Sequence, residues 1–237
     1  MLLYFIRHGD PDYSTDSLTP LGRRQAEAVA HRLAVCGVDK IYASPLGRAQ
    51  QTAEPTAEML RLPVNTEDWT SENTAWKEFT TVFPDGKRRW IFALPVTDIL
   101  TDETVNLTWD NWLDAPFLRD CAAPREGFER IKDASDDFFM RHGYEREGRF
   151  YRVVKGSDER IAIFAHGGFG TVWLSILLGI PPHFVFPTFS IPHCGMSIFE
   201  FGGRDGDLIH PNCLALNDTG AVYADRLPLR YNNSIKY

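Results

Sequence analysis

The chain opens with the stretch Leu2-Leu3-Tyr4-Phe5-Ile6-Arg7-His8-Gly9-Asp10. Its five leading apolar residues, with aromatic and branched side chains among them, predict a buried β-strand. The strand stops at a cation, an imidazole and a glycine, and Gly9 allows the backbone to turn sharply and to approach a ligand. In an open α/β sheet, ligands bind beyond the carboxyl ends of the strands. Arg7-His8-Gly9 is therefore predicted to lie in the ligand-binding crevice.

A second apolar run ends in the same way. Ile161-Ala162-Ile163-Phe164-Ala165 has the continuous apolar character of a central strand, and His166-Gly167-Gly168 follows it. Two strands that each end in His-Gly can bring two imidazoles to one rim of a sheet. Each motif alone is weak, because a histidine after an apolar run is usually a hydrogen-bonded core residue.

Helices and further strands are predicted between these runs. Thr19 is expected to cap a helix that begins at Pro20 and ends at Gly37. A short strand over residues 40–43 is followed by Ser44-Pro45, which predicts the start of a second helix with Arg48 in its first turn. Pro55 is expected to kink or split that helix. The remaining predicted elements are strands over 62–65, 150–154, 160–165 and 196–201, and helices over 127–142 and 172–178.

Composition predicts one α/β domain over residues 1–237. Hydrophobic residues make up 43% of the chain, and a formal net charge of −7 gives no support to a nucleic-acid or membrane partner. The four cysteines are scattered, with no metal-site spacing, so we expect reduced thiols. With no signal-peptide or transmembrane pattern, a cytoplasmic location is predicted. No metal or cofactor is expected.

Residues 66–125 lose the helix and strand periodicity. Five of the six tryptophans of the chain fall within this range, together with several prolines. We interpret the segment as a cap inserted over the strand carboxyl ends. An irregular packed extension explains it equally well. Lys87-Arg88-Arg89 is most simply a solvated charge run, and in a cap it would be placed to grip a phosphate.

Four motifs in order resemble the histidine phosphatase superfamily, the phosphoglycerate-mutase-like proteins. They are Arg7-His8-Gly9, residues 18–23 (Leu-Thr-Pro-Leu-Gly-Arg), residues 44–53 (Ser-Pro-Leu-Gly-Arg-Ala-Gln-Gln-Thr-Ala) and residues 164–168 (Phe-Ala-His-Gly-Gly). The resemblance covers roughly residues 1–75 and 125–200. Together with the strand pattern it implies a three-layer α/β fold: an open, mostly parallel sheet with helices on both faces.

The residue types suit phosphoryl transfer, in which a protein positions a nucleophile and neutralises charge on the phosphoryl oxygens. A neutral imidazole can attack phosphorus and hold the group as phosphohistidine, and guanidinium groups grip phosphate in a bidentate fork. The resemblance implies the same roles, with His8 as nucleophile and Arg7, Arg48 and His166 forming the phosphate pocket. His166 is also placed in the catalytic set, because it can stabilise the transition state.

The general acid and one phosphate ligand are less directly marked. The family places a glutamate a few residues after the third strand, and Glu72 stands there, with Glu78 as runner-up and Glu67 and Asp68 as outsiders. The sequence around Glu72 departs from the family pattern. Relatives often carry an asparagine six residues after the nucleophile; Ser14 occupies that place, and Ser14 or Thr19 is the candidate substitute.

These observations predict a metal-independent phosphomonoesterase acting on a small phosphorylated substrate through a phosphohistidine on His8. The first alternative is a phosphotransferase of the phosphoglycerate mutase type, which uses the same pocket. The second is a non-catalytic phospholigand-binding protein, since fold does not fix function. The residues do not choose the substrate or the oligomeric state.

Overall fold

The computed structural model describes residues 1–229, and a six-stranded sheet lies at its centre. In spatial order the strands are β13 (Asn212–Asp218), β11 (Met196–Glu200), β1 (Leu2–Arg7), β10 (Arg160–Ala165), β4 (Lys40–Ala43) and β5 (Val64–Thr66). The last four are mutually parallel, whereas β11 and β13 are antiparallel additions at one edge. The sheet is therefore mixed and mostly parallel, as predicted.

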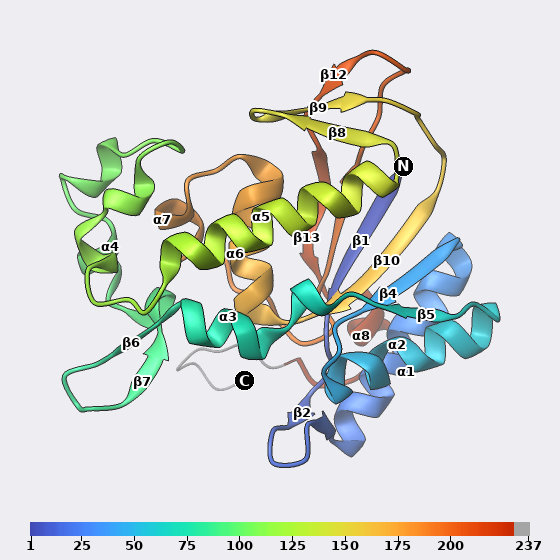
Figure 1. Cartoon of the computed structure of the whole chain (residues 1–237). Coiled ribbons are helices and arrows are strands. Elements are labelled where there is room, and N and C mark those ends of the chain that lie inside the picture. Colours follow the sequence, from blue (N-terminus) through green and yellow to red (C-terminus); the bar gives the residue numbers. More distant parts are fainter. Residues whose placement is uncertain (230–237) are drawn as a thin grey trace.

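Helices cover both faces of this sheet (Figure 1). One face carries α1 (Pro20–Cys36), α2 (Gly47–Leu60) and α8 (Gly220–Ala224); the other carries α5 (Pro124–Arg141) and α6 (Gly167–Leu178). The alternation of side chains along β1 explains the two layers. Leu3 and Phe5 belong to the core under α5 and α6, whereas Tyr4 and Ile6 belong to the core under α1 and α2. The predicted three-layer fold is confirmed.

The register of β1 and β10 decides where the histidines lie. The two strands pair in parallel from Leu2 with Arg160 to Arg7 with Ala165. Parallel strands direct their carboxyl ends to the same sheet edge, so His8 and His166 leave that edge side by side. The predicted meeting of two imidazoles is confirmed.

Two helix-start predictions have different outcomes. Thr19 caps α1 as predicted, accepting the Gly22 amide at 3.1 Å. The predicted start at Ser44-Pro45 is wrong, because α2 begins at Gly47 and the Ser44 hydroxyl lies 2.7 Å from Nε2 of His166. Pro55 neither splits nor ends α2, which is a single helix to Leu60.

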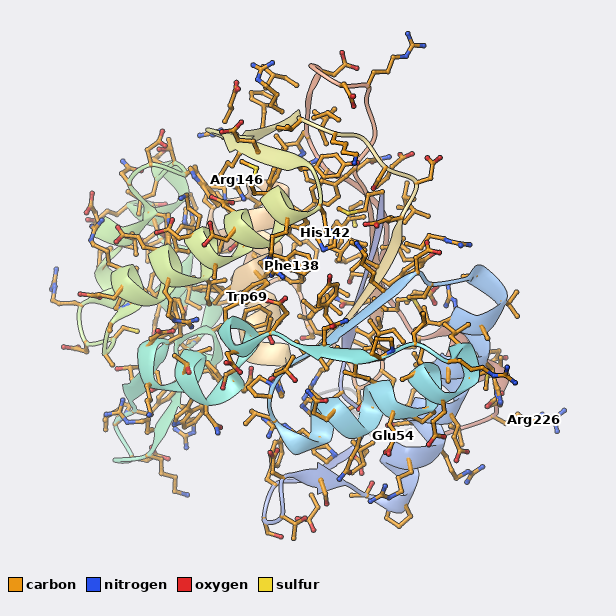
Figure 2. The ribbon with its side chains drawn as sticks, turned by 45° about the vertical axis from the view of Figure 1, so that its right-hand side comes forward. Glu54, Trp69, Phe138, His142, Arg146 and Arg226 are labelled. Atoms are coloured by element: carbon orange, nitrogen blue, oxygen red, sulfur yellow. The ribbon has the colours of Figure 1, made fainter. Side chains whose placement is uncertain are left out.

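The helix α5 packs over the sheet through aromatic side chains. The Phe138 ring of α5 lies beside the Trp69 ring, with centroids 6.0 Å apart, and His142 lies at the end of the helix (Figure 2). The Phe138 and His142 centroids are 4.9 Å apart, and the Tyr42 hydroxyl lies 3.2 Å from Nε2 of His142. This core supports α6, and with it the loop that carries His166.

Residues 66–125 fold as short elements around one end of α5 and α6 (Figure 1). These are η1 (Asp68–Thr70), α3 (Glu72–Glu78), β6 (Thr80–Val82), β7 (Arg88–Trp90), η2 (Ile91–Ala93), α4 (Val96–Ile99), η3 (Thr104–Asn106), η4 (Trp112–Asp114) and η5 (Pro116–Leu118). Ile91 and Trp112 are buried in the same core cluster as Phe138. The segment thus shares the main core, and its role as a cap stays a prediction.

The remaining elements are small. They are the hairpin of β2 (Pro11–Asp12) and β3 (Ser17–Leu18), the sheet of β8 (Tyr144–Glu147), β9 (Phe150–Val153) and β12 (Leu208–Ile209), and the helix α7 (Pro182–Val185). Within residues 1–229, no helix has the length and apolar character needed to cross a bilayer.

Candidate active site

His8 stands directly after β1 and is almost completely buried, with 1% of its surface exposed. Its Nδ1 lies 2.7 Å from the carbonyl oxygen of Gly9, so the proton is assigned to Nδ1, which donates to that carbonyl. Nε2 then keeps its lone pair, and Nε of Arg48 donates to it at 3.3 Å. Burial holds the pKa of His8 well below its usual range, and the Arg7 charge lowers it further. The ring is therefore neutral near pH 7.

A glycine is required after His8. A Cβ at Gly9 would lie 2.6 Å from the carbonyl oxygen of Gly22, closer than any real contact. The backbone of the His8 loop thus packs directly against the first turn of α1. This packing restrains the backbone next to His8.

His166 stands directly after β10, with its ring centroid 5.2 Å from that of His8. Its Nε2 lies 2.7 Å from the Ser44 hydroxyl, and its buried Nδ1 has no hydrogen-bond partner among the described residues. Burial, followed by the charges of Arg48 and Arg7, holds its pKa well below the usual range.

Two arginines provide positive charge beside the histidines. Arg7 lies at the end of β1 and is anchored by a hydrogen bond from Nη1 to the carbonyl of Ile191. Arg48 lies in the first turn of α2 with 6% of its surface exposed, and its Nη1 is paired with the carboxylate of Asp16. Arg7, His8, Arg48 and His166, drawn from three separate motifs, are thus brought together.

Glu72 is the first residue of α3, and its carboxylate lies beside the same cluster. Its Oε1 accepts the Gly168 amide at 3.0 Å and its Oε2 accepts the Phe169 amide at 2.9 Å, both in the first turn of α6. Burial raises the pKa of this carboxyl, although the two amides and the charges of Arg7 and Arg48 act in the opposite direction. A raised carboxyl pKa suits a proton donor.

Glu78 and Glu67, two of the other carboxylates considered from the sequence, are engaged elsewhere. Glu78 accepts two hydrogen bonds from Arg130, at 2.7 Å each. Glu67 pairs with Arg141 at 2.7 Å and accepts from the Trp69 indole. Among the four carboxylates considered from the sequence, Glu72 is the one that lines the cavity described next.

A cavity of about 600 Å³ opens beside these residues. Its polar lining includes Arg7, Asp10, Tyr13, Glu72 and His193. Its apolar lining consists of Trp90, Phe92, Ala93, Phe186, Phe189, Ile191 and Pro192. Two segments provide most of this lining. One is the part of the 66–125 segment that contains β7 and η2, and the other is the stretch from Phe186 to His193 after α7.

Ser14 is not brought to this cluster. It is exposed in the turn between β2 and β3, and its hydroxyl donates to Asp12 at 2.6 Å. Asp16, two residues later, is the side chain of this turn that reaches Arg48, and its Oδ2 accepts the Gly47 amide at 2.7 Å. Thr19 is used to cap α1 and donates to Asp10 at 2.7 Å.

Sequence reasoning missed three residues of the site. Asp16 and Tyr13 lie in a polar loop without periodicity; the Tyr13 ring lies 5.3 Å from the guanidinium carbon of Arg48. The His193 ring lies 5.5 Å from that of His8, and its Nδ1 is 3.7 Å from Asp10. The only sequence signal for His193 is its place just before a strand, at Pro192-His193-Cys194.

The basic run of the 66–125 segment does not line the cavity. Arg89 is paired with Asp85 and lies over the Phe83 ring, with its guanidinium carbon 4.7 Å from the centroid. Arg88 donates to the Thr80 hydroxyl at 3.1 Å. The next residue, Trp90, is the one that faces the cavity.

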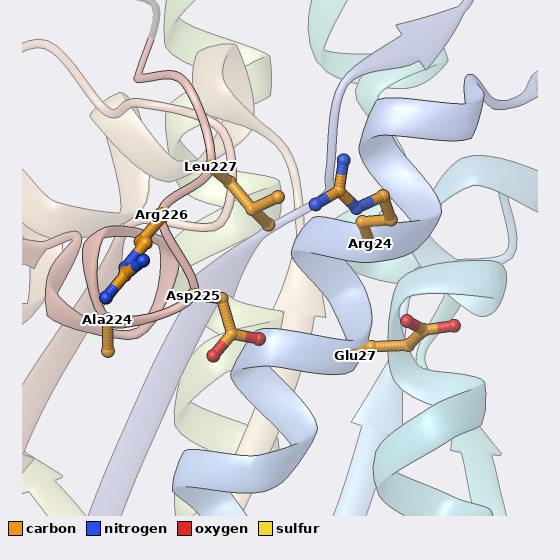
Figure 3. Close-up of a pocket in the computed structure, with 6 residues that line it drawn as sticks. All are labelled: Arg24, Glu27, Ala224, Asp225, Arg226 and Leu227. Carbon is orange, nitrogen blue, oxygen red and sulfur yellow. The ribbon is translucent and has the colours of Figure 1, made fainter.

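A second, shallower hollow lies elsewhere, between α1 and the end of α8. Figure 3 shows Arg24 and Glu27 on α1 beside Asp225 and Leu227. None of the clustered histidines and arginines lines it. Among residues 1–229, no group of three or more histidine, cysteine, aspartate or glutamate side chains is placed to hold a metal ion.

Comparison with known proteins finds a family match over about the first third of the chain. Residues 3–81, which contain Arg7, His8, Arg48 and Glu72, match the family model of the histidine phosphatase superfamily (branch 1). This region of the chain is therefore similar to the histidine phosphatase superfamily.

Two curated proteins match the chain in different ways. A Proteus mirabilis protein, provisionally named as the phosphoglycerate mutase GpmB, is 38% identical over 74 residues, which span 27% of this chain and 34% of the relative. A Hydrogenobacter thermophilus protein, provisionally named as phosphoserine phosphatase 2, is 25% identical over 90% of this chain and 95% of its own length.

The fold also matches that of a solved structure. A histidine-to-alanine mutant of phosphoserine phosphatase from Entamoeba histolytica, in complex with phosphoserine, superposes with a TM-score of 0.60. The alignment covers 93% of this chain and 98% of that protein at 21% identity. At this identity the likeness concerns the fold.

Proposed function

We propose that this protein is a metal-independent phosphomonoesterase that uses His8 as its nucleophile. The observation that carries the proposal is the state of His8: its Nδ1 is held by the Gly9 carbonyl, and Nε2 is left without a proton beside Arg48 and His166. The full-length relative named for phosphoserine phosphatase supports hydrolysis over mutase activity.

The first step is in-line attack of Nε2 of His8 on phosphorus. The bond from phosphorus to the ester oxygen breaks as the bond to nitrogen forms, and Glu72 gives its proton to the leaving alkoxide. Arg7 and Arg48 neutralise charge on the phosphoryl oxygens, and the uncharged ring of His166 donates a hydrogen bond to one of them. For this, the phosphoryl group must displace the carboxylate of Asp16 from Arg48.

The second step returns the enzyme to its starting state. The Glu72 carboxylate takes a proton from water, which attacks phosphorus and releases Nε2 of His8 and inorganic phosphate. The two steps balance: the ester and water are consumed, the alcohol and phosphate are formed, and Glu72 ends protonated. The 66–125 segment, which supplies Glu72, serves in this proposal as a cap over the site.

The deciding experiment is phosphate release from a panel of phosphomonoesters with EDTA present. We expect the wild type to turn over and His8→Ala to lose about 10³-fold or more in kcat. His31→Ala is the matched control, since His31 lies exposed on α1. Equal activity in His8→Ala and wild type would refute the nucleophile assignment.

A phosphoglycerate mutase activity is the second candidate, because the Proteus mirabilis relative that matches locally carries that name. A mutase needs His8 to start phosphorylated. Strict dependence on a bisphosphorylated primer would therefore favour this alternative. Tight phosphate binding with neither activity would favour a phospholigand-binding protein.

A further inference from the structure

We infer that the leaving group of the substrate is an uncharged, aromatic or otherwise apolar alcohol, and that Trp90 is its main contact. The inference rests on the proposed phosphomonoesterase activity and adds the substrate class. It differs from phosphoserine, the ligand of the Entamoeba histolytica protein, whose leaving alcohol carries a carboxylate.

The position of Glu72 fixes where the leaving group lies. An acid that protonates the ester oxygen must touch it, so the alcohol extends from Glu72 into the cavity that Glu72 lines. Trp90 lies against this point, because a Cβ at Gly168 would be only 2.5 Å from Cζ2 of its indole. The Gly168 amide is itself bound to Glu72. The indole thus packs beside the amide that binds Glu72.

The wall beyond Trp90 is aromatic and already assembled. The Trp90 and Phe92 rings are stacked, with centroids 5.1 Å apart and planes at 14°. The ring centroids of Phe92 and Phe186 are 5.7 Å apart. Trp76 packs edge-to-face on Trp90, with ring centroids 5.0 Å apart. Fixed aromatic rings of this kind contribute contact area with little loss of side-chain freedom on binding.

The charges of the cavity disfavour a carboxylate on the leaving group. Among the described residues that line it, the one arginine is Arg7, which is assigned to the phosphoryl group, and no lysine is present. Asp10 supplies a carboxylate to the lining, whereas Glu72 is uncharged when it acts as the proton donor. Arg88 and Arg89 are directed to Thr80 and Asp85 instead. An anionic leaving group would meet apolar surface and the Asp10 carboxylate, and the imidazole of His193 already faces Asp10 at 3.7 Å.

The test compares kcat/KM for four alkyl phosphates whose leaving alcohols differ in charge and polarity. They are 2-phenylethyl phosphate, glycerol 3-phosphate, O-phosphoserine and 3-phosphoglycerate. We expect 2-phenylethyl phosphate to exceed the two carboxylate substrates by about 10-fold or more, the effect of burying one aromatic ring. A wild-type preference for either carboxylate substrate would overturn the inference and leave the phosphomonoesterase proposal standing.

Three variants locate the effect. Trp90→Ala is expected to lower kcat/KM for 2-phenylethyl phosphate about 10-fold and for glycerol 3-phosphate less than about 3-fold. Phe83→Ala, on the same hairpin but outside the cavity lining, is the matched control. Ala93→Arg adds a cation at an exposed lining position and is expected to raise activity on 3-phosphoglycerate about 5-fold. An equal loss on every ester in Trp90→Ala would contradict the assigned role of Trp90.

Binding separates this inference from the catalytic proposal. If no ester is hydrolysed, the phosphomonoesterase proposal fails. Calorimetry with 2-phenylethylphosphonate and 3-phosphonopropionate then still decides the preference of the cavity. We expect about 10-fold tighter binding of the aromatic phosphonate; tighter binding of the carboxylate compound would overturn the inference.

Discussion

Nε of Arg48 donates to Nε2 of His8 across 3.3 Å, which joins the start of α2 to the end of β1. A guanidinium in this position opposes protonation of the imidazole and so keeps the lone pair available. The same fork can turn to phosphoryl oxygens when a substrate enters. In the proposed mechanism, one side chain thus serves both the nucleophile and the group that it attacks.

We expect Arg48→Lys to lower kcat/KM by about 10²-fold or more. Lysine keeps the charge but loses the planar fork that reaches both His8 and a phosphoryl oxygen. Steady-state kinetics on one phosphomonoester measure the loss. Arg24→Lys, on the exposed face of α1, should retain wild-type kinetics.

A second prediction concerns Asp16, whose carboxylate occupies Arg48 in this structure. Asp16→Asn keeps an oxygen for the Gly47 amide but removes the charge that competes with phosphate for Arg48. Inorganic phosphate should therefore inhibit the variant more strongly, by about 3- to 10-fold in inhibition constant.

The control for Asp16 lies in the same hairpin. Asp12 is partly exposed and bonds only locally, to the amide and hydroxyl of Ser14. Asp12→Asn should leave phosphate inhibition at the wild-type level. Weaker phosphate inhibition in Asp16→Asn would show that Asp16 supports anion binding, contrary to this account.

The central elements were predictable because their signals are local. The apolar runs of β1 and β10 and the Thr19-Pro20 start of α1 are each visible within a few residues, and each is confirmed. The start of α2 was not predicted correctly, because the Ser44 side chain bonds His166, which lies far along the chain, and does not cap the helix. A capping residue that bonds elsewhere has no local signature.

The site shows the same division between local and tertiary information. Arg7, His8, Arg48 and His166 follow strands or start helices, so their places at the sheet edge could be inferred. Ser14 and Asp16 share one turn, and backbone geometry decides which of them faces Arg48. Asp16 adopts a left-handed conformation, with φ of 49°, and its side chain is the one that reaches the guanidinium.

His193 and the aromatic wall of the cavity depend wholly on tertiary packing. Trp90 follows a basic run that, from sequence, is the more conspicuous feature. Its contact with Gly168 joins segments far apart in the chain. No periodicity marks such a contact, so the sequence could not identify the residues that line the leaving-group side.

A third prediction concerns the pH dependence of turnover. The pKa of His8 lies below its usual 6.5, so loss of the nucleophile by protonation should occur only on the acid side of that value. The pKa of Glu72 lies above its usual 4.5, and activity should fall as pH rises through it, because the proton donor is lost. A bell-shaped profile is expected, limited on the acid side by protonation of His8 and on the basic side by ionisation of Glu72.

Glu72→Ala isolates the basic limb of that profile. The variant should lose the dependence on the Glu72 pKa, and its defect should grow with the basicity of the leaving alcohol. We expect a loss of about 10²- to 10³-fold on alkyl phosphates and a much smaller one on 4-nitrophenyl phosphate, whose leaving group needs no proton. An equal loss on both substrates would exclude Glu72 as the proton donor.

The last prediction separates Glu78 from catalysis. Its carboxylate takes two hydrogen bonds from Arg130 of α5, and the Trp69 carbonyl accepts a third from the same guanidinium. Glu78→Gln removes the charge and one oxygen acceptor, so we expect the free energy of unfolding to fall by about 1–2 kcal/mol. Because Glu78 does not line the cavity, kcat/KM at a temperature well below the unfolding transition should stay within about 2-fold of wild type. Urea unfolding and steady-state kinetics on the same preparation provide both numbers. A large kinetic defect that depends on leaving-group basicity, with unchanged stability, would transfer the role of proton donor from Glu72 to Glu78.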